Sequence, residues 1–165
     1  MSGEVVVKPH DLAAGKIYGW RGRCIDFFAR GERTVAATLE AVCEKDTSLK
    51  IGHLAGQRLS DLRKIVEIDS NATKRQQKIA LQALNDWQKV EVRRPYFSHG
   101  VVTVLIERNS DWHVRLDFTK YQGKTREPQS WSCSVVEAQQ FEAELECAFK
   151  NLSSQLGQFR KRLSA

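Results

Sequence analysis

The stretch that decides the fold is SVVEAQQFEAELECAFKNLSSQLGQFRKRL, residues 134–163. Apolar side chains recur in it every three or four positions, which is the spacing of a helix that buries one face. Ser134 and Glu137 have the S-x-x-E spacing of a capping box, in which each side chain accepts a hydrogen bond from an otherwise unpaired backbone N–H. Acidic residues gather in the first half and basic residues at the end, as the helix dipole favours. The pattern therefore predicts a long helix over 135–163.

The chain before this helix has the pattern of a β-sheet. Residues 101–106 are rich in β-branched side chains, and residues 112–118 alternate between apolar and polar types. The turn formers Asn109–Asp111 separate these stretches, so we expect an antiparallel hairpin. A third short strand is expected around Trp131–Val135, after a polar loop at Gln122–Pro128.

Three helical segments are expected before the sheet, over residues 12–92. The first covers residues 12–44, as one helix or as two with a break near Gly31, because each internal glycine costs about 1 kcal/mol relative to alanine. The second is expected to follow the cap-like Asp46–Ser48, and the third follows Asp69–Asn71.

The length and composition are those of one globular domain. The chain has 165 residues, of which 41% are apolar and 28% charged, and this balance excludes disorder for most of it. We expect a single domain over residues 1–165, with a flexible N-terminus at 1–11 and a sheet insert at 100–135. The predicted class is mainly α (α+β): an antiparallel bundle of about four helices with a two- or three-stranded antiparallel sheet inserted before the long C-terminal helix.

No apolar run is long enough to cross a membrane or to form a signal peptide, so we expect a cytoplasmic protein without a membrane partner. Its four cysteines, Cys24, Cys43, Cys133 and Cys147, contain no C-x-x-C pair. They are expected to be reduced, buried thiols. We expect neither a bound metal nor a cofactor, because the cysteine spacing fits no usual metal motif.

The net charge of +6 is consistent with a nucleic-acid partner. Residues 1–95 hold 17 basic and 12 acidic side chains, a net charge of +5, whereas residues 96–165 hold 9 and 8, a net charge of +1. This distribution favours the helical half as the place where nucleic acid binds, and disfavours the sheet.

Among the four histidines, His99 has the most suggestive surroundings. It lies in RRPYFSHG, residues 93–100, where Arg94 precedes it by five positions and Arg93 by six. An arginine can hold a phosphate or stabilise developing charge, while a nearby imidazole moves a proton during attack by a ribose 2′-hydroxyl. Arg94 and His99 are therefore the candidate catalytic residues, and Arg93 is a candidate phosphate ligand.

The order of elements resembles the HEPN (higher eukaryotes and prokaryotes nucleotide-binding) domain over residues 12–163. The resemblance rests on helical stretches at 27–35, 59–66 and 83–90, followed by the arginine-to-histidine-glycine segment at 94–100. It implies a helical bundle, commonly a homodimer, that engages RNA or a nucleotide. It also implies a metal-independent ribonuclease, or a degenerate relative of one, in a prokaryotic phage-defence or toxin–antitoxin system with a cognate protein partner.

One residue departs from the pattern of the active members, in which the residue after the motif arginine is often polar. Here it is Pro95, which offers no N–H donor and disfavours helical geometry at Arg94. We therefore do not expect a helix to carry the motif, and we expect reduced or absent activity. Alternatively, Arg94 and His99 end a helix and tie it to a carboxylate such as Glu32.

A second functional class is a non-catalytic module that binds single-stranded nucleic acid with its sheet. Arg115, Lys120 and Lys124 would contact the phosphates, while Tyr121, with Tyr96 or Trp131, would stack on the bases. In outline, this part of the chain is similar to the curved sheet and helix of Whirly-type single-stranded DNA-binding proteins.

A third class is a dimeric interaction scaffold without any nucleic acid. The final helix would bury one face in its own bundle and offer Phe149 or Phe159 to a second subunit. The sequence does not separate a wide core from a dimer interface, since both need apolar residues beyond a single stripe.

Overall fold

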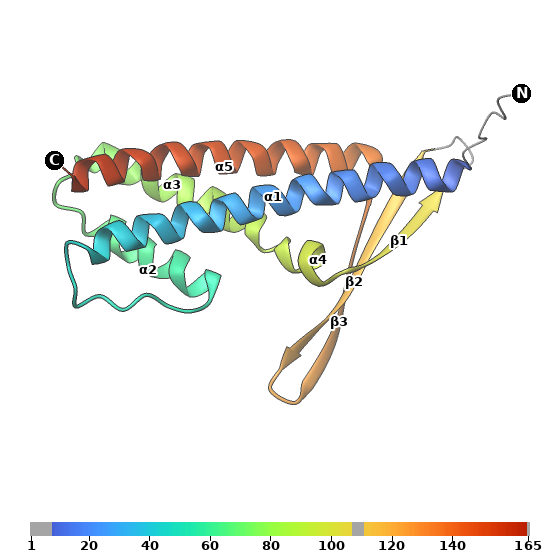
Figure 1. The fold of residues 1–165 in the computed structure, drawn as a ribbon, viewed down its shortest axis with the longest axis horizontal. Coiled ribbons are helices and arrows are strands. Elements are labelled where there is room, and N and C mark those ends of the chain that lie inside the picture. The colour runs from blue at the N-terminus through green and yellow to red at the C-terminus, as the bar shows by residue number, and fades with distance from the viewer. Residues whose placement is uncertain (1–7, 107–110, 165) are drawn as a thin grey trace, which may run out of the picture. The chain divides into compact units, whose positions relative to one another are not determined.

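Figure 1 shows the fold in a computed structural model, which describes residues 8–106 and 111–164. Four main helices accompany a three-stranded antiparallel sheet that precedes the long C-terminal helix in the chain. The predicted class, mainly α with a β insert, is therefore confirmed. The elements are α1 (Pro9–Cys43), α2 (Ala55–Glu67), α3 (Lys74–Glu91), the short α4 (Arg94–His99), β1 (Val101–Ile106), β2 (Trp112–Gln122), β3 (Thr125–Ser134) and α5 (Val135–Leu163).

The chain divides into two compact units. Unit 1 comprises the chain up to Ile25 together with Arg93–Ala143, and unit 2 comprises Asp26–Val92 together with the chain from Glu144 onward. The sheet and α4 belong to unit 1, whereas α2 and α3 belong to unit 2. Each of α1 and α5 contributes one part to each unit.

Unit 2 is built from four helical segments with mixed directions. Phe27 of α1 contacts Phe149 of α5, and Thr38 of α1 accepts a hydrogen bond from Arg160, so α1 and α5 run parallel. Figure 1 shows α2 running in the same direction and α3 running opposite to the other three. The long connection between α1 and α2 returns the chain, which is why only α3 is antiparallel to its neighbours.

α1 is one continuous helix, and no break occurs at Gly31. A Cβ atom at Gly31 would lie 2.1 Å from Cζ2 of Trp87. The indole of Trp87 is buried and packs edge-on against Phe28, with 6.1 Å between ring centroids. Gly31 therefore allows α3 to pack closely on α1, because any side chain there would occupy the space of the indole.

The N-terminal boundary of α1 differs from the prediction. The helix starts at Pro9, inside the stretch 1–11 that was expected to be flexible. Proline is well suited to the first helical turn, where its missing N–H would have no partner within the helix. Residues 1–7 lie outside the described residues, so the prediction for them stays a prediction.

α2 begins at Ala55 and not directly after Asp46–Ser48, so that predicted boundary is wrong. The Asp46 carboxylate instead accepts hydrogen bonds from the backbone N–H and the hydroxyl of Ser48, at 3.0 and 2.6 Å. Such local side-chain bonds stabilise a turn in competition with a helix. His53 consequently precedes α2, and its carbonyl accepts a hydrogen bond from Arg58.

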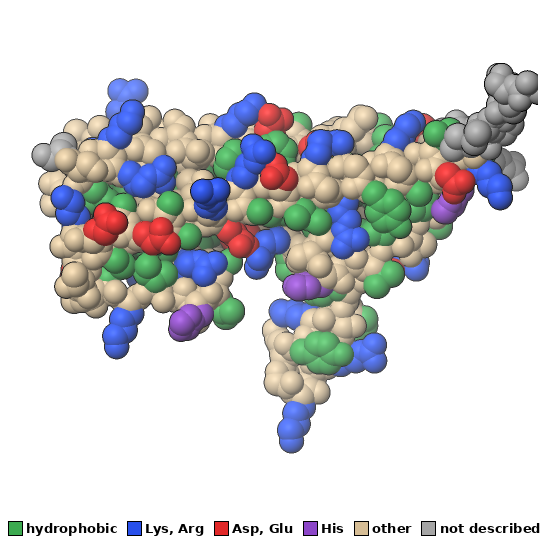
Figure 2. Space-filling view, viewed as in Figure 1, with side chains coloured by type: hydrophobic (Ala, Val, Ile, Leu, Met, Phe, Trp, Pro, Cys, Tyr) green, Lys and Arg blue, Asp and Glu red, His purple; other side chains and the backbone are tan. Residues whose placement is uncertain are grey.

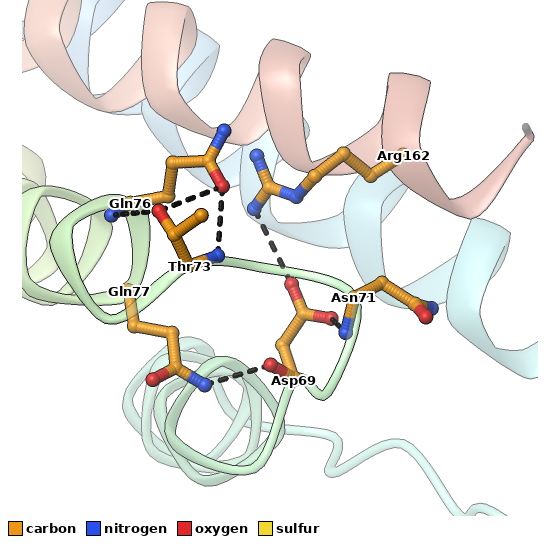
Figure 3. Close-up of polar contacts among 6 residues, drawn as sticks. All are labelled: Asp69, Asn71, Thr73, Gln76, Gln77 and Arg162. Atoms are coloured by element: carbon orange, nitrogen blue, oxygen red, sulfur yellow. Dashed lines mark hydrogen bonds and ion pairs between the residues drawn. The ribbon is translucent and has the colours of Figure 1, made fainter.

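The connection between α2 and α3 is tied to the end of α5. Figure 3 shows the guanidinium of Arg162 directed at the carboxylate of Asp69, with 3.3 Å between Nη2 and Oδ2. The Asp69 side chain is only 6% exposed, and its carboxylate also accepts the N–H of Asn71. Thr73 and Gln76 then form the capping box of α3. These contacts fix the turn that reverses the chain direction.

Unit 1 contains the sheet, with strand order β1–β2–β3. Leu116 of β2 lies between Val102 of β1 and Trp131 of β3. The predicted alternation is confirmed, because Trp112, Val114 and Leu116 are buried on one face. The predicted turn at 109–111 lies largely outside the described residues.

The polar loop predicted at Gln122–Pro128 is wrong, because β2 runs to Gln122 and β3 starts at Thr125. Only Gly123 and Lys124 form the turn. Gly123 has φ +58°, a left-handed conformation that two-residue hairpin turns require and that glycine adopts without strain. The sequence pattern hid the strand residues within 119–128 because neither face is buried there, so no apolar residues alternate along that stretch.

The long C-terminal helix is confirmed, including its cap. The backbone N–H of Ser134 donates to Oε2 of Glu137 at 2.8 Å, and the backbone N–H of Glu137 donates to Oγ of Ser134 at 3.3 Å. The apolar stripe of α5 is buried along the helix, for example at Ala138, Leu145 and Phe159. Phe159 is 1% exposed. Phe159 is therefore not available as the dimer contact considered above.

All four cysteines are free. Cys24 and Cys133 are buried as predicted, Cys43 is half-buried, and Cys147 is exposed, which corrects the prediction for that residue. In none of the helices in the described ranges does an apolar stretch reach the length needed to span a membrane.

Candidate nucleic-acid interface

The arginine-to-histidine segment forms a short helix, α4, from Arg94 to His99. The expectation that Pro95 excludes a helix there is wrong. Pro95 occupies the first turn of α4, where its fixed φ suits a helix and its missing N–H leaves no bond unmade. A proline that would break a helix interior therefore starts this one.

α4 is held rigidly in unit 1 through Phe97, whose side chain is 0% exposed. Its ring stacks on Phe141 of α5 at 5.5 Å and lies 5.1 Å from Trp20 of α1. The guanidinium of Arg21 donates two hydrogen bonds to the Phe97 carbonyl, at 2.8 and 2.6 Å. Arg21 thereby satisfies a carbonyl at the helix end that has no intrahelical partner.

Arg94 and His99 are the first and last residues of α4. They lie five positions apart on α4, which places their side chains about 140° apart around the helix axis at 3.6 residues per turn. His99 is exposed and Arg94 is half-buried. The roles suggested for them, with Glu32 as a supporting carboxylate, stay predictions. Glu32 belongs to unit 2, where it lines a small cavity with Arg58 and Trp87.

An aromatic cluster lies beside the start of α4. The ring of Tyr96 meets that of Phe118 on β2 edge-on at 4.8 Å and lies 6.0 Å from Trp131 on β3. The guanidinium of Arg93 lies over the ring of Trp131, at 5.0 Å from its centroid. All four side chains are only half-buried. We call Arg93, Tyr96, Phe118 and Trp131 the α4 cluster.

Beyond Phe118 the hairpin has no cover on either face, and every residue from Lys120 to Arg126 is exposed. We call residues 119–128 the arm. It holds three basic side chains, Lys120, Lys124 and Arg126, and a single acidic one. Figure 2 shows Lys and Arg side chains over this hairpin, with no acidic side chain on the face in view.

The strand register decides which arm residues share a face. Tyr121, 69% exposed, lies opposite Arg126, while Lys120 lies opposite Glu127 on the other face of the strands. Lys120 therefore shares a face with Phe118 and the α4 cluster. Because side chains alternate along a strand, Arg115 and Lys120 point to opposite faces of β2.

We call the face opposite to the α4 cluster the outer face. Arg115 lies on it and is not a free cation. Its Nε lies 2.8 Å from a carboxylate oxygen of Asp117. A hydrogen bond from Ser130, with that of Arg115, holds the pKa of the Asp117 carboxyl below its usual value, so the carboxylate stays charged and paired. Of the three sheet cations expected to contact phosphates, Lys120 and Lys124 remain, and both lie on the arm.

Two thiols of unit 1, those of Cys24 and Cys133, are buried. Burial raises the pKa of Cys24 and of Cys133 to about 12, which keeps both thiols protonated near neutral pH. Within residues 8–106 and 111–164, no three His, Cys, Asp or Glu side chains come together as a metal-ligand set.

Sequence reasoning missed two parts of this surface. Arg21 looked like one of many helical cations, and nothing local marks it as the cap of a carbonyl 76 positions away. Phe118 was one of the alternating residues 112–118 and was not singled out, although it lies half-exposed beside Tyr96. The sign that could have found it is its position as the last apolar residue before the polar end of β2.

Comparison of the chain with protein-family models, with curated protein sequences and with solved structures found no match. The fold and the surface together define a mainly α protein whose inserted β-sheet extends into an exposed cationic arm.

Proposed function

We propose that this protein binds single-stranded nucleic acid through the arm and the α4 cluster. The observation that supports the proposal is the uncovered hairpin end, which exposes Lys120, Tyr121, Lys124 and Arg126 together. Proteins that bind single strands without strong sequence preference combine cations that follow the phosphates with aromatic rings on which bases stack.

The arm is hard to explain as a structural element. A two-stranded hairpin is at best marginally stable in water, and this one has no apolar face beyond Phe118 to bury. The four strand pairs of the arm, from Thr119–Pro128 to Gln122–Thr125, therefore extend beyond the core without contributing to it. A nucleic-acid strand laid along the arm would give these exposed side chains a partner of opposite charge.

The two faces would make different contacts. On the outer face, Tyr121 beside Arg126 offers a ring and a cation for one nucleotide. On the inner face, which carries the α4 cluster, Lys120 lies two residues beyond Phe118 on β2. Arg93 adds another cation beside the rings of this cluster. The cytoplasmic location expected from the sequence makes RNA the partner to test first.

The test is fluorescence anisotropy with a fluorescein-labelled 20-mer of uridine. The variant Lys120→Ala/Lys124→Ala/Arg126→Ala should bind much more weakly than wild type. Tyr121→Ala should lose about tenfold in affinity, because stacking contributes about 1–3 kcal/mol per base. The matched control replaces three exposed cations of α3, Lys74→Ala/Arg75→Ala/Lys78→Ala, and should bind like wild type. Equal losses in the two triple variants would refute the arm as the binding site.

A second candidate is the HEPN-like ribonuclease, with Arg94 and His99 as its reacting residues. The observation that favours it is that the motif forms a helix despite Pro95. If it is correct, the RNA should be cleaved without added metal, and Arg94→Ala/His99→Ala should abolish cleavage. Intact RNA after prolonged incubation with wild type would contradict it. A role in a defence or toxin–antitoxin system with a cognate protein belongs to this candidate.

A further inference from the structure

The strand β1 forms an edge of the sheet, and among the described residues only β2 pairs with it. Its sequence is VVTVLI, six residues without a charge or a proline. Val101 is 70% exposed, Leu105 49% and Ile106 38%. An edge strand leaves a row of N–H and C=O groups unpaired, and only another strand can complement the whole row.

The opposite edge of the same sheet is different. β3 contains Arg126, Glu127 and Pro128, and proline cannot donate to a ladder. Charges and proline on an edge are the usual means by which a protein prevents another strand from pairing there. These three residues lie on the arm, and the part of β3 level with β1 is Ser130–Ser134, which places serines on the face where β1 has Val101, Thr103 and Leu105. β1 is therefore the edge at which pairing would also bury apolar side chains.

A second copy of the chain fits β1 better than other strands would. Val101, Thr103 and Leu105 lie on the same outer face, since their partners in β2 are alternate residues. In an antiparallel pair of two β1 strands centred on Thr103, Val101 of one copy lies opposite Leu105 of the other. The two most exposed side chains of the strand then cover each other.

Charge gives a second reason for self-association at this strand. The chain has a net charge of +6, so two copies carry an overall electrostatic repulsion. β1 has no charged side chain. When two β1 strands run antiparallel, the backbone N–H groups of one copy can donate to the C=O groups of the other. Two-fold symmetry satisfies this arrangement automatically, because each strand sees the same partner.

We propose that the protein forms a two-fold symmetric homodimer in which the two β1 strands pair antiparallel about Thr103, making one continuous six-stranded sheet. On the inner face this register sets Val102 against Val104 of the second copy. The interface does not depend on nucleic-acid binding, so either proposal can fail while the other stands.

Disulfide cross-linking tests the register. In the proposed dimer the two Thr103 Cα atoms lie about 4.5–5.5 Å apart, within the range that a disulfide spans. Thr103→Cys should therefore cross-link to a dimer on mild oxidation, well beyond the wild-type background from native thiols. Val101→Cys and Leu105→Cys should cross-link when mixed but not alone. Cross-linking of each alone, or none in the mixture, would overturn the register.

A pair of lysine variants tests the interface itself. Thr103 and Ser132 both lie opposite Arg115, one on each side of it, so a lysine at either position has the same strand neighbour. Light scattering without nucleic acid should give twice the chain mass of 18.8 kDa for wild type. Thr103→Lys should raise the dimer dissociation constant at least tenfold, and Ser132→Lys should change it less than twofold.

Two other results would overturn the proposed homodimer. A monomeric wild type at 100 µM would overturn it, as would equal weakening by both lysine substitutions, which would indicate a general effect on the sheet. Circular dichroism of each variant identifies any loss of fold. If a lysine variant unfolds, the cysteine cross-linking still decides, because threonine and cysteine are of similar size.

Discussion

Replacing Gly31 with alanine should destabilise the protein, although alanine is the better helix former. The added Cβ would lie 2.1 Å from the buried indole of Trp87. Overpacking a core costs about 1–3 kcal/mol, and a contact this close to a rigid ring belongs at the upper end. Helix propensity returns about 1 kcal/mol. The net loss should be about 2 kcal/mol, or roughly 6 °C in Tm for a chain of this size.

The matched control is Gly22→Ala in the same helix, because its added Cβ has no atom within 4 Å apart from its chain neighbours and the nearby backbone of its own helix. Only the propensity gain applies there, so Tm should rise by about 3 °C. Thermal and urea unfolding followed by far-UV circular dichroism measures both variants. Adding Trp87→Phe to Gly31→Ala should relieve part of the clash. If Gly31→Ala proves as stable as Gly22→Ala, the packing role assigned to Gly31 is refuted.

Three further predictions concern particular contacts. Asp69→Ala removes the carboxylate partner of the largely buried Arg162 and should lower the free energy of unfolding by about 2 kcal/mol in urea titrations; an unchanged midpoint would contradict this. Gly100→Ala would place its Cβ 2.1 Å from a carbonyl oxygen of α4, so amide hydrogen exchange across α4 should become faster, and unchanged protection would argue against that packing. Because burial raises the pKa of Cys24 and Cys133 to about 12, the native protein at pH 8 should react rapidly with a thiol reagent at two of its four cysteines, and four fast thiols would disprove it.

The sequence predicted best where a local chemical pattern and burial agree. The capping box at Ser134 and Glu137 is a contact between neighbours in the chain, so its spacing predicts it directly. The alternation in residues 112–118 is legible because one face of that strand is buried. In both places the same residues determine the local conformation and its packing.

The predictions failed where a distant partner decides the outcome. Gly31 suggested a break because the indole that needs its space lies on another helix. The arm was taken for a loop because strands exposed on both faces show no apolar alternation. Pro95 argued against a helix because the sequence does not show whether a proline will lie in the interior or in the first turn. The candidate site shared this limit, since the α4 cluster brings together residues from α4 and two strands.

The measurement that tests the central claim most directly is the salt dependence of binding to the labelled uridine 20-mer. If Lys120, Lys124 and Arg126 contact phosphates, each contributes about 0.7 to the slope of log affinity against log salt for a single strand. Replacing all three with alanine should make that slope shallower by about 2, while the α3 control keeps the wild-type slope. A slope unchanged in the arm variant, or no binding by wild type at low salt, would contradict the account.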